Sequence, residues 1–351
     1  MKKILLLMLA GIGDSLLFTP TIRALRKEYP EATITALVRD KPVQAILQRN
    51  KDLNAILYYP FMKSGNLRSV LYCFKLRHEK YDLSVLAYPA NRYQHNVISF
   101  LIGAKKRIAH IYEIKQFTSL SFLHTDRIPI NYSHHTIDEN LFLLTFLGID
   151  KKKCSRKINF SLTQQEKAFA QKYLDEDHIN KKDLLIGIHP GSSELAGMAN
   201  KRWPKERFAE FADMLIEKKK AKILLFGDDS ELPLREEIQK QMRNKVCIVR
   251  TPTVFETAAL IERCKSFISN DTGLMHIASY YEIPSVIILG HLNPHKTRPQ
   301  HKKVKVLSPV TNCQSYRIGE NLVCKYAETE KYCLNQISVE QAYHAFEEVM
   351  R

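Results

Sequence analysis

Residues 3–14 read KILLLMLAGIGD, and this stretch decides how the chain folds. Lys3–Leu9 is an almost unbroken apolar run, which is typical of a β-strand buried on both faces. A short glycine loop follows it, and Ser15–Tyr29 then places apolar residues at helical spacing. A buried strand that turns through such a loop into a helix begins a βαβ unit, so the stretch predicts a parallel sheet covered by helices.

The same alternation of strand and helix continues along the chain and restarts after the basic segment at Lys151–Lys157. We therefore predict an α/β protein of two Rossmann-like, doubly wound domains that face a central cleft. The expected domains are residues 1–160 and 161–335, with a C-terminal helix at 336–351 that packs back on the first domain. Strands are expected at 33–39, 55–59, 83–88, 184–189, 222–226, 246–249, 266–269 and 285–289, and helices at 67–78, 135–147, 205–218, 232–241, 255–264, 274–281 and 338–350.

The charge of the chain is unevenly distributed. The 351 residues carry a net charge of +16, and residues 1–160 hold 25 Lys and Arg against 12 Asp and Glu. Such a field attracts an anionic partner, for example a phosphorylated glycolipid, a membrane surface or a nucleic acid. The chain has no zinc-finger or RNP signature, so we expect no nucleic-acid partner.

Two further features bear on where the protein works. Seven cysteines scattered through a long chain do not suggest a disulfide framework, and we expect a cytoplasmic protein. The lysines at the N-terminus and the apolar run after them resemble a signal peptide, but the run ends without a small-residue cleavage site. No apolar stretch reaches the roughly 18 residues needed to span a bilayer.

The first of four motifs at strand ends is Gly11-Ile12-Gly13-Asp14. Its two glycines allow a sharp turn and a close approach to a ligand, and the N–H groups of the following helix suit an anion. A dinucleotide fingerprint would need a third glycine where Leu16 stands. Asp40 nevertheless ends the second strand, where a ribose-binding acid would lie, so an oxidoreductase stays open at this point.

Asp14 has two interpretations: it is the N-cap of the helix, or it is a functional acid where the strand opens into the cleft. Pro20 lies within the helical pattern and predicts either a kink or a late start of the regular helix. The loop alone does not separate these alternatives.

The second and third motifs open the second half of the chain. His189-Pro190-Gly191-Ser192-Ser193 closes its first strand, and small residues with hydroxyl and N–H groups suit a diphosphate, although a plain turn is the alternative. Lys201-Arg202-Trp203-Pro204 follows, with the proline expected at the first helical position. Its first lysine either neutralises a leaving phosphate or is an exposed charge.

The fourth motif is Asn270-Asp271-Thr272-Gly273-Leu274-Met275-His276. It follows a strand and opens a helix, so N–H groups converge beside the Thr272 hydroxyl. Asp271 can accept hydrogen bonds from sugar hydroxyls, and His276 lies one turn further on the same side. A capped helix start with a buried histidine is the alternative, but four such loops in two α/β halves favour a ligand between the halves.

Together the motifs resemble glycosyltransferase family nine, the bacterial heptosyltransferases. The resemblance covers nearly the whole chain in order, and Lys-x-Trp-Pro with Asp-Thr-Gly-x-x-His is its most specific part. The matching residues are Gly11-Ile12-Gly13-Asp14 with Pro20, His189-Pro190-Gly191-Ser192, Lys201-Arg202-Trp203-Pro204, Gly227, Asp271-Thr272-Gly273 with His276, and the region from Cys324 to Cys333.

The resemblance implies a GT-B fold, with the acceptor bound by the first domain and the nucleotide-sugar by the second. It implies an inverting transfer without a metal or other cofactor, from ADP-heptose to the anionic inner core of lipopolysaccharide at the inner membrane. In this family pattern Asp14 matches the catalytic base, Lys201 a ligand of the donor phosphates, and Asp271 a sugar-contacting acid. The diphosphate loop is matched by Thr272, Gly273 and His276, and the donor set also includes Ser192 and Ser193.

The sequence departs from the family in two places. Tyr316 breaks the Cys-x-x-Cys that would begin at Cys313. Cys313, Cys324 and Cys333 then provide three thiols without an evident fourth ligand, so we expect no bound metal ion. Gly227-Asp228-Asp229 replaces a segment that usually bears a ribose-binding Glu, which leaves the nucleotide base open.

For the acceptor site we choose four cations from their charge and their places near strand ends: Lys63, Arg68, Arg92 and Arg107. Three other functions remain as alternatives. These are a sugar-nucleotide epimerase on the same fold, an inert sugar-nucleotide or glycolipid-binding protein, and a nicotinamide-dependent oxidoreductase.

Overall fold

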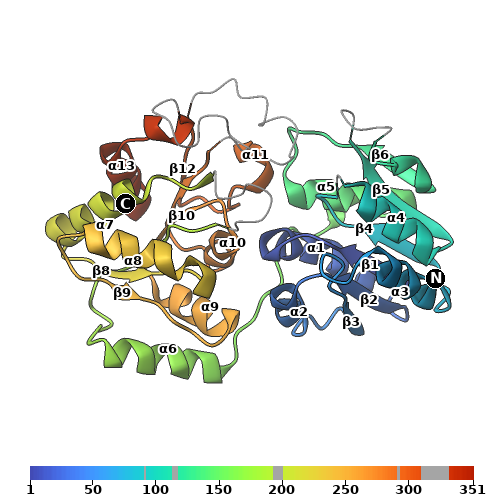
Figure 1. Ribbon diagram of the computed structural model, residues 1–351, viewed down its shortest axis with the longest axis horizontal. Coiled ribbons are helices and arrows are strands. Elements are labelled where there is room, and N and C mark those ends of the chain that lie inside the picture. Colours follow the sequence, from blue (N-terminus) through green and yellow to red (C-terminus); the bar gives the residue numbers. More distant parts are fainter. Residues whose placement is uncertain (91, 113–117, 193–200, 291–292, 310–331) are drawn as a thin grey trace. The chain divides into compact units, whose positions relative to one another are not determined.

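The computed structural model describes residues 1–351 except 91, 113–117, 193–200, 291–292 and 310–331. The chain divides into two compact units, Met1–Ser161 and Leu162–Arg351 (Figure 1). Each unit is built on one six-stranded sheet. None of the helices in the described part of the chain is both long and apolar enough to cross a bilayer.

The first sheet has the strand order β3-β2-β1-β4-β5-β6, and all neighbours are parallel. β1 is central and covered on both faces, which explains its apolar sequence. Leu6 points into the cluster beneath α1 and α5, whereas Leu5 and Leu7 point into the cluster beneath α3 and α4. The strands are β1 Lys3–Met8, β2 Thr33–Val38, β3 Ala55–Tyr58, β4 Leu83–Leu86, β5 Lys106–Ile111 and β6 Asp126–Pro129, and the helices are α1 Ile12–Glu28, α2 Lys41–Leu47, α3 Asn66–Arg77, α4 Tyr93–Ile102 and α5 Thr136–Phe142.

Helix α1 begins at Ile12, so Pro20 lies inside it and does not mark a late start. A proline has no N–H to donate to the carbonyl four residues earlier, which here belongs to Leu16. The hydroxyl of Thr19 donates to this carbonyl instead, at 2.7 Å, and its oxygen accepts the N–H of Asn159 at 2.8 Å. The side chain next to the proline therefore replaces the missing helical hydrogen bond.

The helix expected at 135–147 is divided in the structure. Helix α5 ends at Phe142, and a 3₁₀ turn at Leu143–Leu147 completes the segment. Gly148 ends it with φ 76°, a left-handed conformation that glycine adopts without strain.

The second sheet has the order β12-β11-β10-β7-β8-β9, again with parallel neighbours. Counted along the chain, both sheets place their strands as third, second, first, fourth, fifth and sixth, which is the doubly wound order. Its strands are β7 Leu185–His189, β8 Lys222–Leu225, β9 Cys247–Ile248, β10 Ser266–Asn270, β11 Ser285–Ile288 and β12 Val304–Leu307, and its helices are α6 Gln164–Glu176, α7 Lys205–Lys219, α8 Leu232–Gln241, α9 Val254–Arg263, α10 Gly273–Tyr280, α11 Pro294–Thr297 and α13 Val339–Met350.

The C-terminal helix α13 belongs to the second unit. It packs against α7, β11 and β12. Ala342 and Phe346 lie in the core cluster of that unit together with Phe208 of α7. The apolar face of this helix therefore completes the second core, and the expected packing of residues 336–351 on the first domain stays a prediction.

The strand order reverses beside the central strand of each sheet, between β1 and β4 and between β7 and β10. Loops that leave two such strands diverge, and they open a crevice at the carboxyl edge where doubly wound sheets bind ligands. The motifs at Gly11, Gly191 and Asp271 all follow these strands. The topology thus places the predicted chemistry at the ligand-binding edge of its own sheet.

We expect Trp203→Ala to lower the free energy of unfolding by about 3–5 kcal/mol, the usual cost of deleting a large buried aromatic. The indole packs against Phe208 and Phe211, and its Nε1 donates to the carbonyl of Ile337 at 3.0 Å. Trp203→Phe should cost less because a ring remains. Denaturant titration by circular dichroism measures this, since Trp203 is the sole tryptophan. Tyr93→Ala, which removes an exposed ring, is the control; equal effects of the two alanine variants would contradict the prediction.

Candidate active site

Two loops of the second unit meet at the switch point of its sheet. One follows β7 and contains Gly191 and Ser192; the other follows β10 and leads into α10. His189 lies in register with Ser269, so the loops leave neighbouring strands at nearly the same level. Residues that are far apart in the sequence are therefore brought together at one edge.

Lys201 and Asp271 form a nearly buried ion pair at this edge. Nζ of Lys201 lies 3.0 Å from Oδ2 of Asp271 and 3.2 Å from its main-chain oxygen. Burial alone would raise the pKa of Asp271, but the adjacent Lys201 ammonium holds it below its usual range. The carboxylate is therefore ionised at neutral pH. It holds the ammonium group of Lys201 next to the start of α10, whose N-cap is Thr272.

Thr272 is the N-cap of α10, yet its side chain makes no capping hydrogen bond. Its Oγ1 lies 2.9 Å from Nδ1 of His189, and Nε2 of that histidine lies 3.0 Å from Oε2 of Glu231. Hydrogen bonds lower the pKa of Glu231 despite its burial, so the carboxylate only accepts. Nε2 of His189 must then carry a proton, and in the neutral imidazole Nδ1 accepts from the threonine. His189 thereby turns the hydroxyl away from the first N–H groups of α10, which are the groups that suit an anion.

Glu231 also explains two glycines. A Cβ at Gly191 would lie 2.0 Å from Oε1 of Glu231, and one at Gly227 would lie 2.8 Å from Oε2. At Gly227 φ is +159°, which also disfavours other residues. The two glycines leave space for the carboxylate between their backbones, so the loops after β7 and β8 are held by one side chain that the sequence did not single out.

Ser192 is buried and is held by Arg202. The Nε of Arg202 donates to Oγ of Ser192 at 3.2 Å, and Nη2 donates to its carbonyl oxygen. Arg202 thus brings a second cation to the loop after β7, and the sequence reasoning had assigned it no role. Ser193 lies outside the described residues.

His276 is buried in the second turn of its helix, next to the ion pair. Burial lowers its pKa to about 4; Lys201 acts in the same direction and Asp271 against it. The imidazole is therefore neutral at pH 7 and adds no charge to the site. The positive charge at this edge comes from Lys201 and Arg202.

In the first unit, Asp14 is the third residue of α1 and is half-buried. The N-cap is Gly11, so the interpretation of Asp14 as the cap is wrong. A Cβ at Gly11 would meet no atom within 4 Å, so the packing of the unit leaves room there. Asp14 lies in the first turn of the helix that leaves the central strand, with Gly13 directly before it.

A buried acidic group lies close to this position. Burial raises the pKa of Tyr88, which follows β4, and Glu139 and Asp14 raise it further, so both carboxylates are near the phenol. Glu139 lies 3.4 Å from Nε2 of His110 and 3.1 Å from Nδ1 of His134. The sequence reasoning missed Glu139, because its partner His110 comes from the distant strand β5.

Two arginines lie at the same edge. Burial lowers the pKa of His95 to about 3, and Arg39 and Arg92 lower it further, so both guanidinium groups lie near the imidazole. Arg39 directly follows β2, and Arg92 is the N-cap of α4. Nε of Arg39 also lies 3.1 Å from Oδ2 of Asp40, which engages the acid that a ribose-binding site would need.

The other predicted acceptor residues are placed differently from one another. Lys63 and Arg68 lie where β3 leads into α3, both exposed. Arg107 lies near the amino end of β5, in register with Ser84, and it donates to the carbonyls of Leu123 and Ala104. Arg107 is therefore a structural residue away from the ligand edge, and we withdraw it from the acceptor set.

A family model described as glycosyltransferase family 9 (heptosyltransferase) matches residues 73–326. The chain belongs to this family. Lipopolysaccharide heptosyltransferase 3 of Escherichia coli is 26% identical over 287 residues, which cover 79% of this chain and 80% of that protein. The crystal structure of the family 9 glycosyl transferase from Veillonella parvula DSM 2008 is 25% identical with a TM-score of 0.77, over 99% of this chain and 97% of the other. E. coli heptosyltransferase WaaC, solved with ADP, has a TM-score of 0.67 at 15% identity, over 99% and 97%.

Family membership confirms the resemblance seen in the motifs, the GT-B-like fold and the assignment as a glycosyltransferase. The oxidoreductase alternative is wrong. Within the described part of this family 9 enzyme, no three His, Cys, Asp or Glu side chains are grouped to hold a metal ion. Cys313 and Cys324 lie outside the described residues; Cys333 is described and half-buried.

The pKa of His276 predicts a pH dependence of stability. It is about 4 in the folded protein against 6.5 for a free imidazole, so between these values the unfolded chain binds a proton that the native state does not. The free energy of unfolding should therefore fall as the pH falls from about 6.5 towards 4, by up to about 1.4 kcal/mol per pH unit for this group. Denaturant titrations of His276→Gln should show a shallower slope. His344→Gln, an exposed residue of α13, is the control; an unchanged slope in His276→Gln would contradict the assignment.

Proposed function

We propose that this enzyme transfers a heptose from ADP-heptose to an anionic glycolipid of the lipopolysaccharide inner core, with inversion and without a metal ion. The observation that carries the proposal is the arrangement at the switch point of the second sheet. There Lys201 is fixed beside a helix start whose N-cap hydroxyl is directed to His189. Cations and converging N–H groups are what a departing diphosphate needs.

In the proposed donor site, the residues of each loop have a distinct role. Lys201, Arg202 and the N–H groups at the start of α10 bind the diphosphate. Asp271 accepts from a sugar hydroxyl once the phosphates draw Lys201 towards them. The ADP complex of a family member with the same fold supports an adenine nucleotide at this site.

Asp14 is the proposed general base. Its carboxylate takes the proton from the acceptor hydroxyl while that oxygen forms a bond to the anomeric carbon. The bond from the anomeric carbon to the β-phosphate oxygen breaks, and its electron pair leaves with ADP. Attack from the face opposite the diphosphate inverts the anomeric centre, and the growing charge on the nucleotide is stabilised by Lys201 and Arg202.

The proposed acceptor site rests on the cations at the carboxyl edge of the first sheet. Arg39 and Arg92 lie together near His95, and Lys63 follows β3 at the same edge. An arginine pair suits carboxylate and phosphate groups, which it can bind through two hydrogen bonds at once. An anionic sugar bound there would present its hydroxyl to Asp14.

Lys201→Met should weaken ADP binding by about 10- to 100-fold, the loss typical of a charge-assisted hydrogen bond. Isothermal titration calorimetry with ADP, GDP, UDP and NAD measures it. Lys205→Met removes a lysine four residues away that pairs with Glu237 on the surface, and it should bind ADP as the wild type does. Equal ADP affinity in the Lys201 variant would refute the donor assignment, and preference for GDP or UDP would change the donor but not the reaction.

Asp14→Asn should lower kcat by about 10²–10⁴-fold, because an amide cannot accept the proton, while ADP affinity stays within a few fold. The rate of ADP release in the presence of donor and acceptor measures this. Asp40→Asn, an acid at the same edge that pairs with Arg39, is the matched control and should keep most of the turnover. Near wild-type turnover in Asp14→Asn would remove this residue from the mechanism.

A further inference from the structure

Exposed apolar side chains are concentrated in one part of the first unit. Apart from Met1 and Met350, all the strongly exposed large apolar residues of the described chain lie between Met62 and Phe122. The most exposed belong to α3 and the loop before it: Met62 at 67%, Leu67 at 74%, Leu71 at 60% and Phe74 at 44%. Neighbouring apolar residues with this exposure mark an interaction surface rather than scattered surface residues.

The three side chains of α3 form one stripe, because positions 67, 71 and 74 follow the i, i+4, i+7 spacing of a helix face. The opposite side of the helix carries Cys73 and Leu76, which are buried against the sheet. Helix α3 is therefore apolar on two opposite sides. One side belongs to the core. The other side, formed by Leu67, Leu71 and Phe74, is exposed and is here called the outer stripe.

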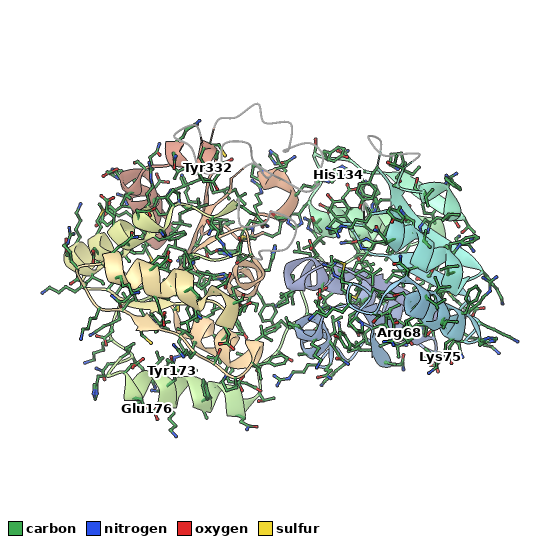
Figure 2. The ribbon with its side chains drawn as sticks, viewed as in Figure 1. Arg68, Lys75, His134, Tyr173, Glu176 and Tyr332 are labelled. Carbon is green, nitrogen blue, oxygen red and sulfur yellow. The ribbon has the colours of Figure 1, made fainter. Side chains whose placement is uncertain are left out.

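Cations border the outer stripe. Arg68 and Lys75 both lie on α3 (Figure 2). Helical spacing places these two on one side of the stripe and Arg77 on the other. The helix contains no acidic residue, and residues 61–110 hold nine Lys and Arg against two acids. Both acids are engaged: Glu79 pairs with Lys3 at 2.9 Å and Asp82 with Lys105 at 3.0 Å. The surplus of positive charge around the stripe is thus left uncompensated by acids of this segment.

Helix α4 extends the same surface. It packs against α3, its sequence YQHNVISFLI contains no Asp, Glu, Lys or Arg, and Tyr93 and Phe100 are exposed on it. Tyrosine and phenylalanine beside basic residues are typical of surfaces that lie at the boundary of lipid head groups and acyl chains.

We propose that α3 docks on an anionic lipid bilayer, with the outer stripe in the head-group region and Arg68 and Lys75 on the lipid phosphates. A helix that places apolar side chains between cations gains both the hydrophobic and the electrostatic part of membrane binding. A second copy of the chain is a poorer occupant, because a symmetric contact through α3 would oppose the arginines and lysines of both copies. The proposal goes beyond the transfer reaction and does not depend on which donor the enzyme uses.

Vesicle co-sedimentation of the full chain tests the proposal directly. We expect binding to vesicles of phosphatidylcholine with about one-third phosphatidylglycerol, weak binding to pure phosphatidylcholine, and loss of binding as salt is raised, since screening shortens the reach of the charges. Arg68→Gln and Lys75→Gln should each weaken binding about fivefold. Lys172→Gln, an exposed lysine of α6, is the matched control and should have no effect.

The apolar contribution is tested with Leu71→Ser/Phe74→Ser, which should lower partitioning at least about tenfold. Met350→Ser, an exposed apolar residue of α13, is its control. The double variant should keep the unfolding transition and the ADP affinity of the wild type, so that a loss of vesicle binding is not a loss of fold or of the donor site. Unchanged vesicle binding in the double variant would overturn the proposal, as would equal binding to neutral and anionic vesicles. Absence of vesicle binding together with a dimer that the double variant abolishes would assign the stripe to a second copy instead.

Discussion

Two parallel sheets, each covered by helices on both faces, determine where chemistry can occur in this protein. Their central strands are apolar over almost their whole length, because both faces are covered and all side chains of β1 after Lys3 and all of β7 are buried. Polar side chains are confined largely to the ends of the strands. The doubly wound order then separates the loops at one point of each carboxyl edge, so Asp14, after the first strand of its sheet, and the loop around Asp271, after the fourth strand of the other, each lie beside a switch point.

The donor edge is built from buried polar groups that satisfy one another. Glu231 accepts from His189, His189 accepts from Thr272, and Lys201 pairs with Asp271. Buried charges are costly unless they are paired, and each of these has a partner at hydrogen-bond distance. The result is a site whose dipoles and cations are oriented before any phosphate arrives, which is the condition for electrostatic stabilisation of a leaving group.

The sequence predicted the elements whose pattern is local. Strand β1 was expected to within one residue, and helix α8 was expected at its observed bounds. The motifs at Gly11, Gly191 and Asp271 follow strand ends as predicted, whereas residues 201–204 lead into α7. Strands β5 and β6 were missed because Lys106, Arg107, Asp126 and Arg127 give them the composition of a loop; their pairing in the sheet overrides that composition.

The site residues that the sequence did not reveal were missed for a different reason. Glu231, Glu139 and Arg39 look like ordinary surface charges in the sequence, since nothing local shows that tertiary partners bury or pair them. Gly191 and Gly227 carried only a weak signal for the same reason: the carboxylate that requires them is contributed by a third segment. Arg107 illustrates the opposite error, because charge and proximity to a strand were taken as evidence of a ligand edge while the register places it at the other end.

The excess positive charge and the proposed nucleotide site belong to different units of this molecule. The unit that holds the proposed nucleotide site is nearly neutral, with 28 Lys and Arg against 25 Asp and Glu in residues 161–351, whereas residues 1–160 carry most of the excess. The nucleotide edge needs few charges because they act through short hydrogen bonds at fixed positions. The excess on the first unit lies partly on the exposed outer side of α3, where it cannot hold a small anion in place. Diffuse charge of this kind suits an extended anionic surface, because attraction to many lipid head groups requires proximity rather than geometry.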